Sequence, residues 1–281
     1  MIPRRNRQQA HDRQNRQIPV FVGCNHSLDL HARFGRVVAT MERMCGRGGH
    51  DFSWRQVFDY LNVVGEPPAG HFRRLNVAPS SRRGDGVDWT ELPAVVAGDD
   101  GQREFVRMVW PLVPGWMKGE LPKFSTANCR SEPGVPFSET VAKKPTFRTA
   151  WKKDQRCLVP FSWFYEWDQR TQPKQPWRVL PAEAPMLVMA GLWDETRPPG
   201  GAAFRSFTLV TAEPNRLLRE IGHHRAPVIL GPEQWSTWLQ GSAEEAQAQI
   251  APPPEGALTA HRVTKRVNNP GYEEEDLLRP C

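Results

Sequence analysis

A methionine followed by a cysteine, Met44 and Cys45, is the pair with the most distinctive chemical potential in this sequence. If translation starts at Met44 and the methionine is removed, Cys45 carries a free α-amine beside its thiol. An α-amine has a pKa of about 7.7–8.0 against about 10.4 for lysine, so at about pH 7.4 roughly 0.3 of it is unprotonated, compared with about 0.001 of a lysine amine. This amine condenses with an aldehyde to an imine, and the neighbouring thiol then closes on the imine carbon to form a thiazolidine ring. The alternative is an ordinary interior thiol, because free cysteines are among the most buried residues.

Three other stretches carry side chains suited to proton transfer or to binding anions. "TANCRSE" supplies an amide, an arginine and a carboxylate, "WFYEWD" places a glutamate among aromatic residues, and "IGHHRAPVIL" places two histidines and an arginine before an apolar run. In that order, the residues are Asn128, Arg130, Glu132, Glu166, His223, His224 and Arg225. Each stretch alone also has a structural interpretation, as a turn amide, an outward-facing strand residue or a solvated helix end. The stretches become informative as a set beside Cys45.

The elements that must position these groups are mainly strands. Apolar residues at helical spacing predict one helix within residues 52–61. "PAVVAGDDGQREFVRMVW" predicts a hairpin, because two apolar runs flank a Gly/Asp turn. Runs rich in Val, Phe and Trp predict further strands in "RCLVPFSWFYEW", "PWRVL", "PMLVMAGLW" and "FRSFTLVT". Other helices are expected only at about residues 146–153, 214–221 and 232–240. We therefore predict a β-dominated α+β domain.

Length and composition bound the class of protein. With 281 residues, 39% of them hydrophobic, the chain is long enough for one main domain. It holds no run of about 18 apolar residues, so we expect a soluble protein that stays in the cell. Five cysteines without a C-x-x-C pair suggest neither a disulfide framework nor a zinc site, which fits a reducing cytosol. We expect no metal and no organic cofactor.

Net charge is concentrated at the start of the chain. Residues 1–43 hold eight arginines, no lysine and three acidic residues, which accounts for +5 of the total of +6. Bulk charge therefore says little about nucleic-acid binding by the rest. This leader is polar and unpatterned, so we predict that it is disordered or not translated. A mitochondrial transit peptide is the alternative, which we rank lower. The expected domain spans residues 44–270, and an acidic tail, 271–281, is expected to cover one of its edges.

An ordered series of short segments resembles a known family. The segments are "MCGR" (44–47), "NVAP" (76–79), "WPLVPGW" (110–116), "NCRSE" (128–132), "RCLVPFSWFYEW" (156–167), "KQPW" (174–177), "AGLWDE" (190–195), "SFTLVTAEPN" (206–215), "HHRAPVIL" (223–230) and "VNNP" (267–270). No segment is specific alone, but the ten in this order are. The sequence resembles the SRAP family (SOS response-associated peptidases, proteins that process abasic sites), from Met44 to about Asn269. The resemblance implies a single domain with a mixed, barrel-like sheet and a few short helices.

The resemblance also implies a reaction and the residues that carry it. As the mature N-terminus, Cys45 would attack the ring-opened aldehyde of an abasic site in single-stranded DNA and end as a thiazolidine crosslink. By motif, Asn128 would hold the sugar or the amine, and Glu166 would donate and accept protons around imine formation. His223 would assist opening of the deoxyribose ring. The residues implied to contact phosphates or pack against bases are Arg47, Pro79, Trp116, Arg130 and Arg225.

The same resemblance implies the partner and setting of the protein. Its partner would be single-stranded DNA that contains abasic sites, which the crosslink protects during the damage response, and no membrane is involved. We expect a monomer in the cytosol or nucleoid of a bacterium. Abasic-site lyase activity and autopeptidase activity are further candidates.

A few positions depart from the family pattern. Gly48 stands where an aromatic residue is common and is followed by Gly49, whereas Trp163 stands where glycine is common. Cys129 and Ala226 replace an alanine and a methionine. We expect the two glycines to loosen the chain behind the reactive cysteine, and Trp163 to change only packing or DNA contact.

The leader conflicts with the implied chemistry, because Cys45 in a peptide bond to Met44 has no free amine. Either translation starts at Met44, which we favour, or the leader is removed, with autoproteolysis as one route. Two other functions stay open. One is a cysteine peptidase with Cys45 as nucleophile, His223 as base and Asn128 as orienting or oxyanion group. The other is a non-covalent DNA-binding module in which Cys45 is structural, although the small net charge of the domain argues against binding by charge alone.

Overall fold

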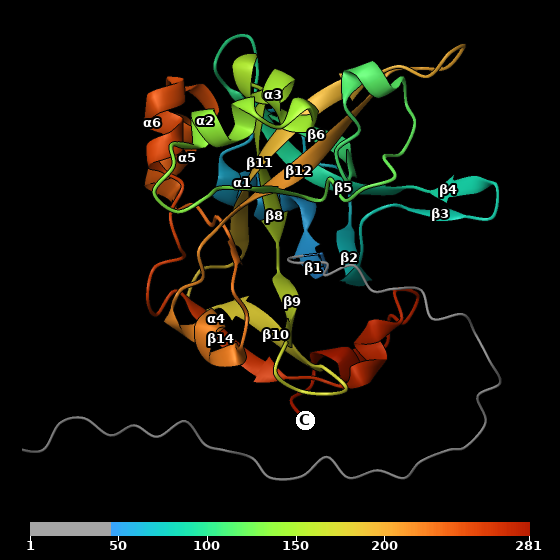
Figure 1. Ribbon diagram of the computed structural model, residues 1–281, viewed down its shortest axis with the longest axis vertical. Coiled ribbons are helices and arrows are strands. Elements are labelled where there is room, and N and C mark those ends of the chain that lie inside the picture. The colour runs from blue at the N-terminus through green and yellow to red at the C-terminus, as the bar shows by residue number, and fades with distance from the viewer. Residues whose placement is uncertain (1–45) are drawn as a thin grey trace, which may run out of the picture.

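Strands dominate the structure, a computed structural model that describes residues 46–281. They form a closed, barrel-like sheet in the upper half of Figure 1 and a five-stranded sheet in the lower half. The β-dominated α+β fold with a barrel-like sheet and a few short helices is thus confirmed. The predictions for the leader and for Cys45 fall on residues outside the described part of the chain.

Five strands close the barrel-like sheet into a ring. Their order is β11-β8-β5-β6-β12, and β12 pairs again with β11. The bounds are β5 (Thr90–Ala97), β6 (Arg103–Trp110), β8 (Arg156–Phe161), β11 (Leu187–Thr196) and β12 (Phe204–Ala212). Two short strands, β7 (Asn128–Arg130) and β13 (Ala226–Pro227), pair with the last residues of β12. The expected hairpin is the β5–β6 pair.

Side chains of the ring strands alternate between its interior and the helices outside it. On β8, Cys157, Val159 and Phe161 belong to one buried cluster, whereas Leu158 belongs to a second cluster, which holds most of the buried helix residues. This alternation follows from the two-residue period of a strand. Because both faces are buried along β8 and the first part of β11, these strands are nearly continuous apolar runs in the sequence.

The lower sheet has the order β14-β10-β9-β1-β2. Its strands are β1 (Gly48–Ser53), β2 (His71–Val77), β9 (Trp163–Asp168), β10 (Gln175–Pro181) and β14 (Leu258–Arg262). β8 and β9 are one stretch of chain that changes sheet at Ser162, whose amide donates to the carbonyl oxygen of Gly49 (2.9 Å) and whose hydroxyl accepts from the amide of Asp51 (2.8 Å). The change of sheet carries Glu166 out of the ring. A separate hairpin, β3 (Ser81–Arg83) and β4 (Gly86–Asp88), projects to the right in Figure 1.

Short helices pack mainly against the ring. They are α1 (Trp54–Leu61), α2 (Phe137–Ala142), α3 (Pro145–Lys152), α4 (Arg216–Ile221), α5 (Trp235–Gln240) and α6 (Ala243–Ala248), with 3₁₀ turns η1 (Gly115–Met117), η2 (Pro232–Gln234), η3 (Lys265–Asn268) and η4 (Glu275–Leu278). The predicted helices correspond to α1, α3, α4 and η2 with α5, whereas α2 and α6 were not predicted. The signal for α6 was a capping box, in which the Ser242 hydroxyl accepts from the amide of Glu245.

The two glycines of β1 lie against aromatic rings and not in a loose loop. A Cβ at Gly48 would lie 2.6 Å from the ring of Phe161, and one at Gly49 would lie 2.2 Å from the indole of Trp163. The loosening expected from these glycines is therefore not what the structure shows. They let two large side chains approach the strand.

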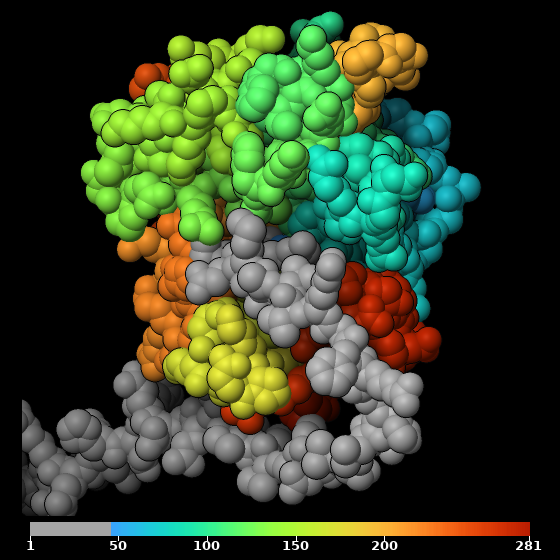
Figure 2. Space-filling view, turned by 45° about the vertical axis from the view of Figure 1, so that its right-hand side comes forward, coloured from blue at the N-terminus to red at the C-terminus, as the bar shows by residue number. Residues whose placement is uncertain are grey.

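The end of the chain folds over the edge strand of the lower sheet, as the sequence predicts. Val267 and Leu277 are buried in one cluster with Leu75 of β2. In the space-filling view, the red segments near the end of the chain lie in the lower half of the molecule, whereas cyan and green segments make up most of the upper half (Figure 2). None of the helices within residues 46–281 is long and apolar enough to cross a membrane.

Candidate functional site

The end of strand β12 brings two of the predicted segments together. Leu209 to Thr211 pair in parallel with Asn128 to Arg130 of β7. Thr211 also pairs with Pro227 of β13. The "NCR" and "HHRAP" segments therefore flank the same strand end.

A buried histidine and glutamate form the chemical centre of this region. Nε2 of His223 lies 2.9 Å from Oε2 of Glu166, and both side chains are only 1% exposed. Nδ1 of His223 lies 2.9 Å from the carbonyl oxygen of Arg225. A carbonyl oxygen only accepts, so Nδ1 carries a hydrogen and the tautomer is fixed. The short distance between Nε2 and the carboxylate places one acid–base contact in a site that is closed to water.

The end of helix α4 delivers His223 to this position. The helix ends at Gly222, whose φ of 88° is in the left-handed region that favours glycine. The amide of His223 donates to the carbonyl oxygen of Leu218 (2.9 Å). A Cβ at Gly222 would lie 2.5 Å from Oδ1 of Asp168, so the helix end packs closely on β9.

The surroundings of His223 favour its charged form. Burial lowers the pKa of His223, but the charge of Glu166 and the contact with its carboxylate raise it by more. The carbonyl oxygen of Arg225 acts in the same direction, and Lys174 opposes it. The net result is a pKa above the ordinary value of 6.5, so His223 keeps its second ring proton to a higher pH than a free histidine would.

Strand β9 sets Glu166 against the start of the described chain. β1 and β9 run antiparallel, and the amide of Tyr165 donates to the carbonyl oxygen of Arg47 (3.0 Å). Continuing this order by one residue places Gly46 opposite Glu166. Gly46 is buried and is bonded to Cys45, which lies outside the described residues.

Arg47, predicted to contact phosphate, makes several contacts within the protein. Its Nη1 donates to Oδ1 of Asn76 and to the carbonyl oxygen of Val267, both at 2.8 Å. Its guanidinium lies over the ring of Trp167, 5.9 Å from the centroid. Contact with DNA stays a prediction, and the structure adds a second role in holding the start of β1.

The other predicted DNA-binding residues differ in exposure. Arg130 is exposed at the end of β7, Trp116 is 57% exposed and Pro79 is half-buried. Arg225 is only 7% exposed, and its Nη2 donates to the carbonyl oxygen of Thr211 (2.6 Å). Arg130 is therefore the more accessible of these two arginines, and the DNA contacts of all four residues stay predictions.

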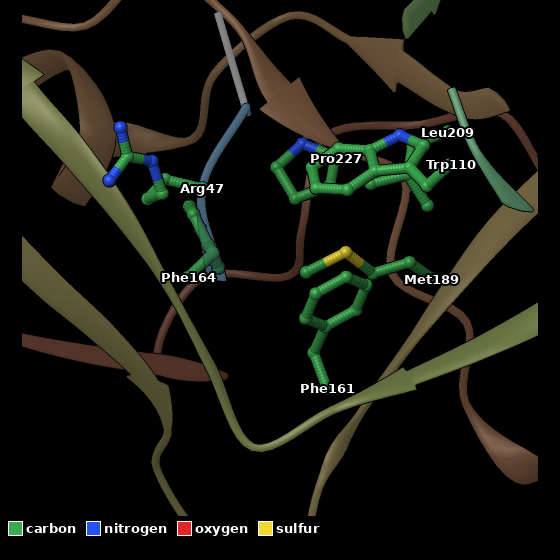
Figure 3. Close-up of a pocket in the computed structure, with 7 residues that line it drawn as sticks. All are labelled: Arg47, Trp110, Phe161, Phe164, Met189, Leu209 and Pro227. Carbon is green, nitrogen blue, oxygen red and sulfur yellow. The ribbon is translucent and has the colours of Figure 1, made fainter. Parts of the chain in front are cut away.

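A small pocket lies where the start of β1, the end of β12 and strand β13 meet (Figure 3). It is lined by Arg47, Trp110, Phe161, Phe164, Met189, Leu209 and Pro227. Leu209 is the residue that pairs with Asn128, Pro227 belongs to the same segment as His223, and Arg47 precedes β1. Figure 3 shows the guanidinium of Arg47 pointing away from the other lining side chains, so the wall facing the pocket is apolar.

Three connecting residues were not singled out from the sequence. Asn76 binds Arg47, the carbonyl oxygen of Thr211 accepts from Arg225, and Nε1 of Trp110 donates to the carbonyl oxygen of Ala127 (3.1 Å), directly before Asn128. All three lie inside the ten short segments that resemble the family, and this position was the signal from which the sequence could have identified them. Within residues 46–281, no group of three or more His, Cys, Asp or Glu side chains is arranged to hold a metal ion.

Comparison with models of known protein families shows to which family the chain belongs. The model of the SOS response associated peptidase (SRAP) family matches residues 44–270. The chain belongs to the SRAP family.

Curated relatives of this SRAP chain come from bacteria and animals. It is 28% identical over 241 residues to the abasic site processing protein YoqW of Bacillus subtilis (strain 168), which covers 84% of this chain and 99% of YoqW. It is 31% identical over 223 residues to the abasic site processing protein HMCES of Pongo abelii, which covers 68% of this chain and 61% of HMCES. The match therefore spans almost all of the bacterial relative and a smaller part of the animal one.

Solved structures are similar to this SRAP chain in fold. A crystal structure of a protein from Bordetella bronchiseptica has a TM-score of 0.61 at 26% identity, covering 78% of this chain and 100% of that one. One from Bacteroides thetaiotaomicron has a TM-score of 0.59 at 20% identity, covering 85% and 97%. The second shows the fold alone.

Proposed function

We propose that this SRAP protein processes abasic sites in single-stranded DNA by forming a thiazolidine crosslink through Cys45 as its first residue. The observation that carries the proposal is the buried pair of Glu166 and His223, because the strand that holds Glu166 lies beside the residue bonded to Cys45. Relatives named as abasic site processing proteins support the choice of substrate.

The bond changes of this reaction balance with the loss of one water. The amine nitrogen of Cys45 adds to the C1 aldehyde of the opened sugar, and the resulting hydroxyl leaves as water to give an imine. The thiol sulfur then adds to the same carbon while its proton moves to the nitrogen. These steps need one proton delivered to the departing oxygen and one removed from the nitrogen. The acid–base contact between Glu166 and His223 suits both transfers.

Opening of the sugar ring needs the same kind of group. A proton must reach the ring oxygen while another leaves the C1 hydroxyl, and His223 with Glu166 supplies an acid and a base in one contact. Asn128, paired with Leu209 at the pocket wall, offers an amide that can hold the sugar in place.

Exposed groups near the domain surface fit a single strand with unpaired bases. Trp116 lies on a loop fixed at both ends, since the amide of Gly115 donates to Oδ2 of Asp194 (2.9 Å) and that of Gly119 donates to Oγ1 of Thr196 (2.8 Å). A fixed, exposed indole is a stacking platform that accepts any base. Unpaired bases are available in single-stranded DNA, which supports that substrate.

The cysteine peptidase alternative has less support. A Cys–His peptidase needs a ring nitrogen that can take the thiol proton. Both ring nitrogens of His223 already face oxygen atoms, those of Glu166 and Arg225. Cleavage before Cys45 within the same chain stays a separate proposal for removal of the leader.

Intact-mass spectrometry tests the proposed function. A chain started at Met44 is expected to lose the methionine and then to gain the mass of a single-stranded abasic oligonucleotide minus one water. The matched controls are an oligonucleotide whose abasic site has been reduced to the alcohol, a Cys45→Ser variant and a chain that retains residues before Cys45. None of the three is expected to give a denaturant-resistant adduct. Failure of the parent to form that adduct would reject the proposal.

A further inference from the structure

Asn76 joins the start of β1 to the C-terminal segment, residues 267–278. Asn76 is 1% exposed, and its Oδ1 accepts from Nη1 of Arg47 at 2.8 Å. Its Nδ2 faces three carbonyl oxygens of the C-terminal segment. They belong to Val267, Asn269 and Tyr272, at 3.1, 2.7 and 3.1 Å. An amide bonded at both ends is fixed in one orientation, so the segment determines where Asn76 presents its oxygen to Arg47.

Glu273 holds the same residue through the backbone. β2 is an edge strand of the lower sheet, and such an edge presents backbone groups to whatever lies beside it. Oε2 of Glu273 accepts from the amides of Leu75 and Asn76, the latter at 3.2 Å. Arg74 lies 3.7 Å from the other carboxylate oxygen. A charged acceptor shared by two adjacent amides is a strong anchor, so both the backbone and the side chain of Asn76 depend on the segment.

The C-terminal segment also contacts the strand that carries Glu166. Nε1 of Trp167 donates to Oδ1 of Asn268 (2.7 Å), and the hydroxyl of Tyr165 donates to the carbonyl oxygen of Leu75 (3.0 Å). Both neighbours of Glu166 in the sequence are therefore tied to the segment or to the strand it covers. Figure 1 shows this red segment beneath β2 at the bottom of the molecule.

We propose that residues 267–278 form a buttress for the reacting end of the chain, with Asn76 and Glu273 as residues that position Arg47 and hence Cys45. The inference rests on the proposed function of Cys45. The family match ends at residue 270, so Glu273 lies outside the matched region. Positioning matters because the amine must meet the aldehyde within reach of the proton-transfer pair, and a displacement of about 1 Å costs up to about 10²-fold in rate.

Three substitutions in the buttress separate positioning from general stability. Glu273→Ala removes the acceptor for the two β2 amides, whereas Glu273→Gln loses the charge but keeps an acceptor oxygen. Glu275→Ala is the matched control, because it removes the ion pair with Arg73 from the same segment without touching Asn76. Each change is made in the chain that starts at Met44. The measurements are the crosslinking rate at saturating abasic DNA, the half-saturating DNA concentration and hydrogen exchange of peptides that cover residues 46–53.

The expected result is a loss of rate that exceeds any loss of DNA binding. Glu273→Ala should lower the saturated crosslinking rate roughly 10- to 100-fold, change the half-saturating DNA concentration by a smaller factor and speed hydrogen exchange at the start of β1. Glu273→Gln should restore most of the rate and the protection, and Glu275→Ala should behave like the parent.

Several outcomes would overturn the buttress. A parental rate and parental exchange in Glu273→Ala would do so, and so would equal losses in Glu273→Ala and Glu275→Ala, because that pattern means general destabilisation. A parent protein that forms no crosslink rejects the proposed function instead. The hydrogen-exchange comparison then still decides whether Glu273 orders the start of β1, and unchanged exchange rejects the buttress as well.

Discussion

The indole of Trp163 fills the space in which a side chain at Gly49 would lie. Its nearest atoms are 2.2–2.3 Å from the position of a Cβ at Gly49, which is too close for any real contact, and Trp163 is 2% exposed. The two positions therefore depend on each other across β1 and β9. A tryptophan on one strand requires a glycine on the other.

Substitution of Gly49 should be destabilising for this reason. Gly49→Ala is expected to lower the free energy of unfolding by about 1–3 kcal/mol, because the ring or the strand must shift. Gly86→Ala in β4 is the matched control, since its nearest heavy atom would be 3.8 Å away, and its effect should stay within about 0.5 kcal/mol. Urea denaturation measures both. Equal stability of the two variants would contradict the dependence on Trp163.

Removal of the carboxylate from the buried pair should slow the reaction. Glu166→Gln is expected to lower the single-turnover crosslinking rate by about 10²–10⁴, because a proton-transfer group is lost, while affinity for DNA stays near that of the parent. Glu183→Gln, at an exposed position, is the control. An unchanged rate in Glu166→Gln would remove this residue from the mechanism.

Stability should fall as the pH rises through the pKa of His223. Burial lowers and Glu166 raises this pKa, with a net increase above 6.5. The folded protein therefore keeps a proton that the unfolded chain has already released. The contribution of the pair to the free energy of unfolding is complete below about pH 6.5 and is lost as the pH passes the folded-state pKa. In Glu166→Gln, burial and the charge of Lys174 lower this pKa and only the carbonyl oxygen of Arg225 raises it, so the slope should vanish or reverse. Urea denaturation from about pH 6.5 to 9 measures how the free energy of unfolding changes with pH in the parent and in Glu166→Gln. Equal slopes in the two proteins would contradict the prediction.

Part of the acid sensitivity should come from a different histidine, His50, which is fully buried. Its ring packs against those of Phe52, Phe72 and Phe161. Desolvation, with the charge of Arg74, lowers the pKa of His50 to about 3. Between that value and about 6.5 the unfolded chain binds more protons, so stability falls as the pH falls, by at most about 1.4 kcal/mol per pH unit. His50→Phe should flatten this dependence, and His71→Gln, at an exposed site, should keep it. The same acid dependence in both variants would contradict the prediction.

The two arginines beside β12 should respond differently to substitution. Arg130→Ala should reduce by about 1 the slope of the logarithm of the binding constant against the logarithm of the salt concentration, as expected for one lost phosphate contact. Arg225→Ala removes a buried donor to Thr211, and we expect it also to lower the free energy of unfolding by about 1–3 kcal/mol. Binding to an oligonucleotide with a reduced abasic site, which cannot crosslink, measures the slopes. A parental slope in Arg130→Ala would remove this residue from the DNA contacts.

The β-dominated fold could be predicted because ring strands buried on both faces leave continuous apolar runs such as "PMLVMAGLW". The change of sheet at Ser162 could not, since "RCLVPFSWFYEW" has the same apolar character on both sides of that serine. Helix α2 was missed because no side chain caps its start, which follows Pro136. The local composition indicates that a strand is buried, but it does not indicate to which sheet the strand belongs.

The candidate site was predicted as a set of residues and not as an arrangement. The contact between Glu166 and His223 joins segments far apart in the sequence, and only the fold brings them to 2.9 Å. The burial of Arg225 was not visible because an arginine is exposed in most settings. Asn76 was overlooked for a similar reason, since an asparagine in a short motif is most simply interpreted as a turn residue.

The residues of this site lie far apart along the chain, so they are also synthesised at different times. Cys45 is made early, Glu166 and His223 follow more than a hundred residues later, and the buttress residue Glu273 comes last. At about 5–20 residues per second, residue 223 is synthesised roughly 10–35 s after residue 45. Under the proposed function, a growing chain that starts at Met44 therefore carries its aminothiol before its acid–base partners exist, and the complete reaction centre is assembled only when translation is nearly finished.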